Sequence, residues 1–121
     1  MHQNVQSIGN SINKLNVMLI SHPECQVMCV SEHWKSEDQL KSFSINGLKL
    51  GASFCREEGR HGGTAVFVRN DVKSSARVKL NKLSISNVFE CSAIECQLCN
   101  VNIVVVCIYR PPQADLGMFF L

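Results

Sequence analysis

Short strand-length runs follow one another along most of the chain, and they constrain the fold more than any other feature. The longest apolar run, VNIVVVCIY over 101–109, is far shorter than the roughly 20 residues that a membrane-spanning helix needs. The period and composition of the sequence predict strands over 25–32, 48–59, 64–72, 78–86, 88–98 and 101–112. Because short connections join neighbouring strands, we expect an antiparallel meander.

A helix is predicted ahead of these strands, over residues 7–24. Its apolar residues fall on one helical face: Ile8, Ile12, Leu15, Leu19 and Ile20. Ser7 is a candidate N-cap, and Pro23 ends the pattern. Residues 35–47 are polar, with room for one helical turn before a turn at Asn46-Gly47. A helix against a sheet gives an α/β fold, either an α/β or an α+β sandwich.

The composition indicates one small globular domain. The chain has 121 residues, of which 45% are hydrophobic, and this supports a packed core. The net charge of +2 permits a nucleic-acid partner without arguing for one. Seven cysteines, an odd number, and an N-terminus without an apolar signal-peptide pattern lead us to expect reduced thiols in an intracellular compartment.

Polar side chains stand at the carboxyl ends of several predicted strands. Asn4 precedes the helix, Glu32 ends the strand over 25–32, and Tyr109 ends the last strand. Each has an ordinary alternative role: Asn4 as a helix cap, Glu32 as a solvated carboxylate, and Tyr109 as a core residue with a bonded hydroxyl. Three such ends on one edge of a sheet would form a common site.

Four stretches, in this order and at these separations, resemble a known family: NVQSIGNSINKL, CVSEHW, GRHGGTAVFV and VCIYRPP. They are similar to the N-terminal half of the endonuclease/exonuclease/phosphatase superfamily, and most of all to the apurinic-like endonuclease domain of non-LTR retrotransposons. The resemblance covers about residues 3 to 121. It implies a two-sheet α/β sandwich of the deoxyribonuclease-I-like type, with 1–121 as a partial domain.

The resemblance also implies an activity, namely Mg²⁺-dependent nicking of DNA by a nuclear, reverse-transcriptase-associated mobile element. Glu32 matches the family's metal ligand, and Asn4 matches the Asn beside the metal. Tyr109 matches the Tyr whose hydroxyl donates to a phosphate oxygen, and Arg110 is a weaker match to a group that contacts the nucleic-acid backbone. Nuclease and phosphatase members share Asn, Glu and Tyr, and the YRPP ending favours the retrotransposon group. No membrane is implied.

Two motifs of the family do not occur in the chain. One is a Gly-Asp-Phe-Asn-like stretch that orients the nucleophilic water, and the other is a later Ser-Asp-His-like stretch. Residues 113–121 begin a helical pattern that stops on bare apolar residues, so we interpret the chain as the first half of a domain. Since losing one triad-type residue costs factors of about 10⁴ to 10⁶ in rate, we expect no activity from the chain alone.

Other hypotheses remain open. Half a sandwich would expose an apolar sheet face, which predicts self-association or another binding role. CQVMC over 25–29 and CQLC over 96–99 could supply thiolates to a zinc site, although the turn residues of a zinc ribbon are missing. His33 is expected to be structural or at a rim, and His61 exposed. Gly62-Gly63 is expected to make a tight start to a strand rather than a phosphate cradle.

Overall fold

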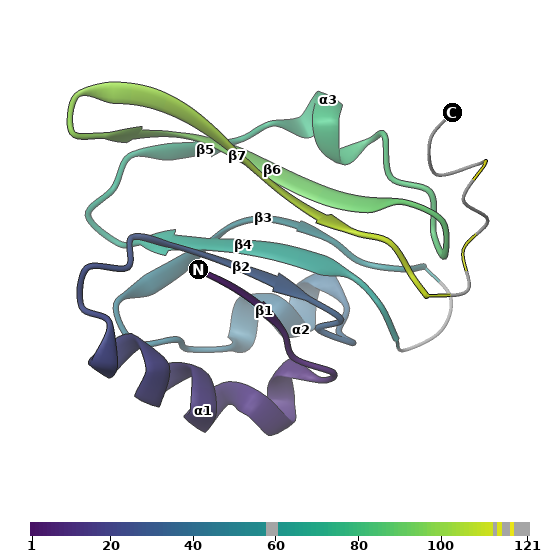
Figure 1. Ribbon diagram of the computed structural model, residues 1–121, viewed down its shortest axis with the longest axis horizontal. Helices are drawn as coiled ribbons and strands as arrows, with labels where there is room; N and C mark the ends of the chain where they lie inside the picture. Colours follow the sequence, from purple (N-terminus) through teal and green to yellow (C-terminus); the bar gives the residue numbers. More distant parts are fainter. Residues whose placement is uncertain (58–60, 113, 115–116, 118–121) are drawn as a thin grey trace.

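The computed structural model describes residues 1–57, 61–112, 114 and 117, and shows a mixed α/β fold with two facing sheets (Figure 1). The first sheet has the strand order β1-β2-β4-β3, and the second has the order β5-β6-β7. Their bounds are β1 His2–Asn4, β2 Val27–Ser31, β3 Leu48–Phe54, β4 Thr64–Arg69, β5 Ser74–Ala76, β6 Glu90–Leu98 and β7 Val101–Tyr109. The coarse expectation of an α/β sandwich agrees with this arrangement.

The predicted meander describes only the second sheet. There β6 pairs antiparallel with both β5 and β7, and a two-residue turn at Cys99-Asn100 joins β6 to β7. Both turn residues have positive φ, which matches the twist of a hairpin. In the first sheet β3 and β4 also pair antiparallel, but the chain then crosses to the second sheet at β5, so the prediction of one continuous meander is wrong. The remaining strand, β1, runs parallel to β2. A parallel pair needs a crossover, and helix α1 (Ile8–Ser21) supplies it on the outer face (Figure 1).

The core has two layers, one on each face of the first sheet. Alternate residues of a strand point to opposite faces, so β4 sends Ala65 and Phe67 toward the helices and Val66 and Val68 toward the second sheet. We call the space between the two sheets, which holds Val66, Val68 and Ile94, the inter-sheet layer. Burial on both faces explains why β4 reads as a continuous apolar run.

The two longer helices begin in different ways. Ser7 stands at the N-cap position of α1, as predicted, but its side chain makes no capping hydrogen bond and its φ is 93°. Helix α2 (Glu37–Ser42) has a full capping box, in which Ser36 Oγ accepts from the Gln39 N–H and Gln39 Oε1 accepts from the Ser36 N–H. The start of α1 is instead held by backbone contacts, described below.

The strand predicted over 78–86 is wrong. Helix α3 (Val78–Asn81) lies there, and the edge strand β5 comes earlier. Beyond β5, side chains rather than a neighbouring strand accept hydrogen bonds from the backbone of β6. Asn81 Oδ1 accepts from the Ala93 N–H at 2.8 Å, and Ser84 Oγ accepts from the Cys91 N–H at 3.0 Å. Such local bonds from Asn and Ser compete with a backbone ladder.

Two further expectations concern the C-terminal segment and membrane-spanning helices. The helical pattern predicted over 113–121 lies largely outside the described residues. Within the described part of the chain, no helix is long and apolar enough to cross a membrane.

Candidate functional site

The carboxyl ends of β1, β2 and β7 lie at one end of the sandwich (Figure 1). Asn4 pairs with Ser31 across β1 and β2, and Tyr109 pairs with Glu90 across β6 and β7. The register places Asn4 and Ser31 on the face of the first sheet that carries Cys29, which is the face toward the inter-sheet layer. Tyr109 lies two residues beyond Cys107 and therefore faces the same layer from the opposite sheet.

Glu32 follows β2 directly, and its backbone is fixed in an uncommon conformation. Its φ is 57°, in the left-handed region. The Glu32 N–H donates to the Gly63 carbonyl at 2.8 Å, and its carbonyl accepts from the Ser7 N–H at 2.9 Å. A non-glycine residue held in this region costs about 1–3 kcal/mol and persists only where its surroundings impose it. The start of α1 and the start of β4 together impose the position of Glu32.

The Tyr109 side chain lies near enough to the Glu32 carboxylate, across the inter-sheet layer, for Glu32 to shift its pKa. Burial, a hydrogen bond to Glu32 and the negative charge of Glu32 together raise the pKa of Tyr109 to about 12. All three disfavour the phenolate, so the hydroxyl stays protonated as a donor at neutral pH. Two of the three residues predicted for the site, Glu32 and Tyr109, are thus in direct interaction.

This contact predicts a titration that a spectrometer can follow. Tyr109 is the only tyrosine, so the ultraviolet absorbance of the phenolate reports it alone. We expect a midpoint near the raised pKa of about 12 in the folded protein, and a lower midpoint in Glu32→Gln because a negative charge is removed. In urea the midpoint should return to about 10. Glu24→Gln, at an exposed carboxylate, is the control, and an unchanged midpoint in Glu32→Gln would contradict the contact.

The structure also places the other two predicted residues. Asn4 is exposed and belongs to β1, so it does not cap α1; Ser7 occupies that position instead. Arg110 follows Tyr109, is half-buried, and donates from Nη1 to the Ala114 carbonyl at 3.3 Å. Asn4 therefore lies near Glu32, because its partner in β2 is Ser31, the residue before Glu32. Arg110 lies just after the end of β7.

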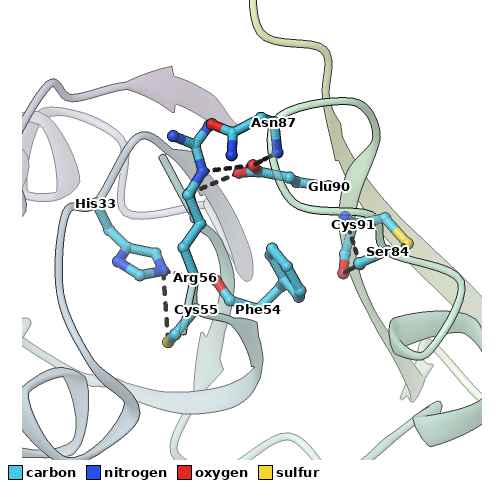
Figure 2. Close-up of polar contacts among 9 residues, drawn as sticks. His33, Phe54, Cys55, Arg56, Ser84, Asn87, Glu90 and Cys91 are labelled. Carbon is cyan, nitrogen blue, oxygen red and sulfur yellow. Dashed lines mark hydrogen bonds and ion pairs between the residues drawn. The ribbon is translucent and has the colours of Figure 1, made fainter. Parts of the chain in front are cut away.

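A buried ion pair beside the site was not anticipated from the sequence. The Glu90 side chain is fully buried, and its Oε2 accepts from Arg56 Nε at 2.6 Å and from the Asn87 N–H at 2.9 Å (Figure 2). Its Oε1 accepts from the Gly63 N–H at 2.8 Å. This carboxylate joins the exit of β3, the start of β4 and the start of β6. The available signal was an acidic residue inside the apolar run over 88–98.

His33, the residue after Glu32, is fully buried, and its side chain bonds to the backbone around the site. Its Nδ1 accepts from the Lys35 N–H at 2.9 Å, so Nε2 carries the proton and donates to the Phe54 carbonyl at 2.9 Å. Burial lowers the pKa of His33, and the ring is neutral. The Cys55 Sγ lies 3.8 Å from Nε2. The structural role expected for His33 agrees with these contacts.

The glycine pair makes a tight start to β4, as predicted. Both residues have positive φ, 73° at Gly62 and 89° at Gly63. Their carbonyls accept from the Trp34 and Glu32 N–H groups, and the Gly63 N–H is bound to Glu90. The Gly63 N–H is therefore already occupied by a protein carboxylate. His61 is exposed, as predicted, and its ring lies 4.3 Å from the ring of Trp34.

The inter-sheet layer changes from apolar to polar toward this end. The residues there that face the layer are Ser31, Thr64, Glu90, Ser92 and Tyr109, where valine, isoleucine and cysteine stand farther along the strands. The hydroxyls of Thr64 and Ser92 are buried without a hydrogen-bond partner within the described residues. Buried polar groups usually have partners, so this end of the layer suits a polar ligand or water better than it suits an apolar one.

The residues present fit one kind of metal better than another. Across residues 1–57, 61–112, 114 and 117, no three His, Cys, Asp or Glu side chains form a metal-binding group. Cys96 is buried in the inter-sheet layer and Cys99 is exposed in the hairpin, so the structure does not assemble the thiolates of the zinc alternative. Mg²⁺ keeps most of its waters and needs only one or two carboxylates, which Glu32 satisfies.

Comparisons with protein-family profiles, with curated proteins and with solved structures find no match to this chain.

Proposed function

We propose that Asn4, Glu32 and Tyr109 form the metal- and phosphate-binding part of a Mg²⁺-dependent site for phosphodiester cleavage in DNA. The fold would then be the deoxyribonuclease-I-like sandwich of the endonuclease/exonuclease/phosphatase superfamily, in its retrotransposon branch. One observation carries the proposal: Glu32 is held in a strained, doubly hydrogen-bonded position at a strand end, where its carboxylate meets the Tyr109 hydroxyl from the opposite sheet. DNA would be the partner and the nucleus the location.

Each residue has a role that its chemistry supports. Glu32 would hold Mg²⁺, which when bound supplies charge to stabilise a phosphoryl transition state. Tyr109 would donate from its hydroxyl to a phosphate oxygen, and its raised pKa of about 12 keeps that proton in place at neutral pH. The Asn4 amide, on the same face, would orient the phosphate. Arg110 would contact the nucleic-acid backbone.

Binding and cleavage are separable in this proposal. The 121 residues contain neither a Gly-Asp-Phe-Asn-like nor a Ser-Asp-His-like stretch, so no Asp–His pair of that type activates the water. We therefore expect the chain to bind Mg²⁺ and phosphate and to leave DNA uncut unless another polypeptide or segment supplies those groups. The residues named here hold and orient the phosphate only.

A plasmid assay tests the cleavage half. When folded protein is incubated with supercoiled DNA and Mg²⁺, we expect no more nicking than with Glu32→Ala. The chain lacks at least one catalytic residue, and the loss of such a residue lowers the rate by a factor of about 10⁴ to 10⁶. Nicking that requires Mg²⁺ and disappears in Glu32→Ala would show that a complete site is assembled, for example between two chains. That result would overturn the separation of binding from cleavage and keep the role of Glu32.

A Mg²⁺ titration tests the binding half. Trp34 is the only tryptophan and lies two residues from Glu32, so its fluorescence is the local reporter. We expect a saturable change that is at least about tenfold weaker in Glu32→Gln, since even the loss of a second-shell partner costs about 10- to 100-fold in metal affinity. Glu95→Gln, a half-exposed carboxylate on β6, is the matched control. Equal titrations of the wild type and Glu32→Gln would refute the site.

A second candidate function is binding through β7, favoured by the apolar surface of that strand. β7 is the edge of its sheet among the described strands, and its exposed apolar residues are Val101, Ile103, Val104, Val106 and Ile108. Val104, Val106 and Ile108 share the outer face of the strand, and exposed apolar side chains on an edge strand typically mark an interface. Sedimentation that depends on protein concentration, and that weakens in Val106→Lys, would support self-association. Sedimentation of a monomer at every concentration would exclude it.

A further inference from the structure

A cavity lined by cysteines lies at the end of the molecule opposite Glu32. It has a volume of about 610 Å³, and its wall is formed by the amino end of β2, the segment before it and the β6–β7 hairpin. Cys25, Cys29 and Cys99 all line it. The structure has no disulfide at these positions, because each of the three is a free thiol. The cavity gives small molecules a route to the Cys29 side chain.

The Cys29 thiol has a partner in the opposite sheet. Cys107, on β7, is buried in the inter-sheet layer, and Cys29 packs against that layer from β2. The two side chains lie close enough for each to shift the pKa of the other. The Cys107 Sγ also lies 3.6 Å from the carbonyl of Val30, the residue after Cys29, which fixes Cys107 beside β2. The pair therefore lies where β2 of the first sheet packs against β7 of the second.

The two thiols differ in the way that a disulfide-forming pair requires. The interaction with Cys107 lowers the pKa of Cys29, and the same interaction, together with burial, raises the pKa of Cys107. The thiol with the lower pKa is the better nucleophile toward an oxidant. Cys29 is also the one that borders the cavity. Attack would therefore begin at Cys29, and Cys107 would resolve the product.

We propose that Cys29 and Cys107 are a redox-reactive pair that forms a reversible disulfide between the two sheets, with a hydroperoxide as the oxidant. The Cys29 thiolate attacks the O–O bond of hydrogen peroxide, which gives Cys29 sulfenic acid and one water after proton transfer. The Cys107 sulfur then attacks the Cys29 sulfur, so that the S–S bond forms, the S–O bond breaks and a second water leaves. Two thiols and one peroxide become one disulfide and two waters, and a dithiol reductant reverses the change.

Peptide mapping of the whole chain tests the pair. Native protein is treated with hydrogen peroxide, the remaining thiols are alkylated, and the digest is analysed for linked peptides. We expect one intramolecular link, between Cys29 and Cys107, that disappears on reduction. Because the bond closes a long loop, the melting temperature should rise by on the order of 10 °C. A link between any other two cysteines, or full alkylation of Cys29 and Cys107, would overturn the proposal.

Single replacements separate the two roles. In Cys107→Ser a sulfenic-acid probe should label Cys29, since no resolving thiol remains. In Cys29→Ser the link should be absent and Cys107 should remain unlabelled. Cys25→Ser is the matched control, because Cys25 lines the same cavity and should leave the link intact. Loss of the link in a folded Cys25→Ser protein would assign the chemistry to Cys25 instead. Circular dichroism shows that each variant is folded, and Cys29→Ala replaces Cys29→Ser if that variant is not.

Discussion

Replacement of Glu90 by alanine should lower the free energy of unfolding by about 3–5 kcal/mol, which is the usual cost of removing one partner of a buried ion pair. The carboxylate is fully buried and accepts from Arg56, Asn87 and Gly63. Without it the Arg56 guanidinium, whose side chain is only 12% exposed, is left without its ion-pair partner in the protein interior. Urea denaturation, followed by circular dichroism, measures the change.

The same strand supplies the control. Glu95 on β6 pairs with Arg77 at 3.2 Å, but both side chains are at least 40% exposed. An exposed pair of this kind contributes about 0–1 kcal/mol, so Glu95→Ala should leave the midpoint almost unchanged. If the two replacements had equal effects, the Glu90 network would not be the structural element described here.

Replacement of Gly63 by alanine should lower the free energy of unfolding by about 2–5 kcal/mol. Two costs combine: about 1–2 kcal/mol for a side chain in the left-handed region and about 1–3 kcal/mol for overpacking. The φ of Gly63 is 89°, and an added Cβ would overlap the imidazole ring of His33. Since the Gly63 carbonyl accepts from the Glu32 N–H, the Mg²⁺ binding that we propose for Glu32 should weaken as well.

Gly47→Ala isolates the backbone cost. Gly47 has a φ of 77°, close to that of Gly63, but nothing lies within 4 Å of a Cβ built there. Its replacement should therefore cost only the conformational part, about 1–2 kcal/mol. The difference between the two glycine variants measures the contact with His33, and a difference near zero would contradict it.

The sequence predicted the elements that depend on local pattern. The 3.6-residue period found α1, and apolar or alternating runs of strand length found β2, β3, β4, β6 and β7. Asn46-Gly47 was located as a turn from its residue types, and Gly47 has the positive φ that glycine readily adopts. Local pattern does not reveal which strands share a sheet, so the parallel pairing of β1 with β2 was missed.

The errors and omissions come from tertiary contacts. The run over 78–86 alternates like a strand, yet Asn81 and Ser84 bond to β6 with their side chains and the backbone turns into α3. Arg56 and Glu90 are 34 positions apart, and the local sequence around either residue does not predict that they pair. Glu32, Tyr109 and Asn4 were proposed from the residues at strand ends and from a family resemblance, and the site formed by them stays a prediction.

The backbone contacts at the start of α1 make the helix and Glu32 one cooperative unit. The N–H groups of Ser7 and Ile8 donate to the carbonyls of Glu32 and His33, so the first turn of α1 ends on the loop that carries the carboxylate. Fraying of that turn would release the Glu32 backbone from the conformation that aims its side chain. Helix α1, which contributes no side chain to the site, would thereby determine how long the site stays assembled. The amide hydrogens of Ser7, Ile8 and Glu32 would exchange with solvent in a single opening event.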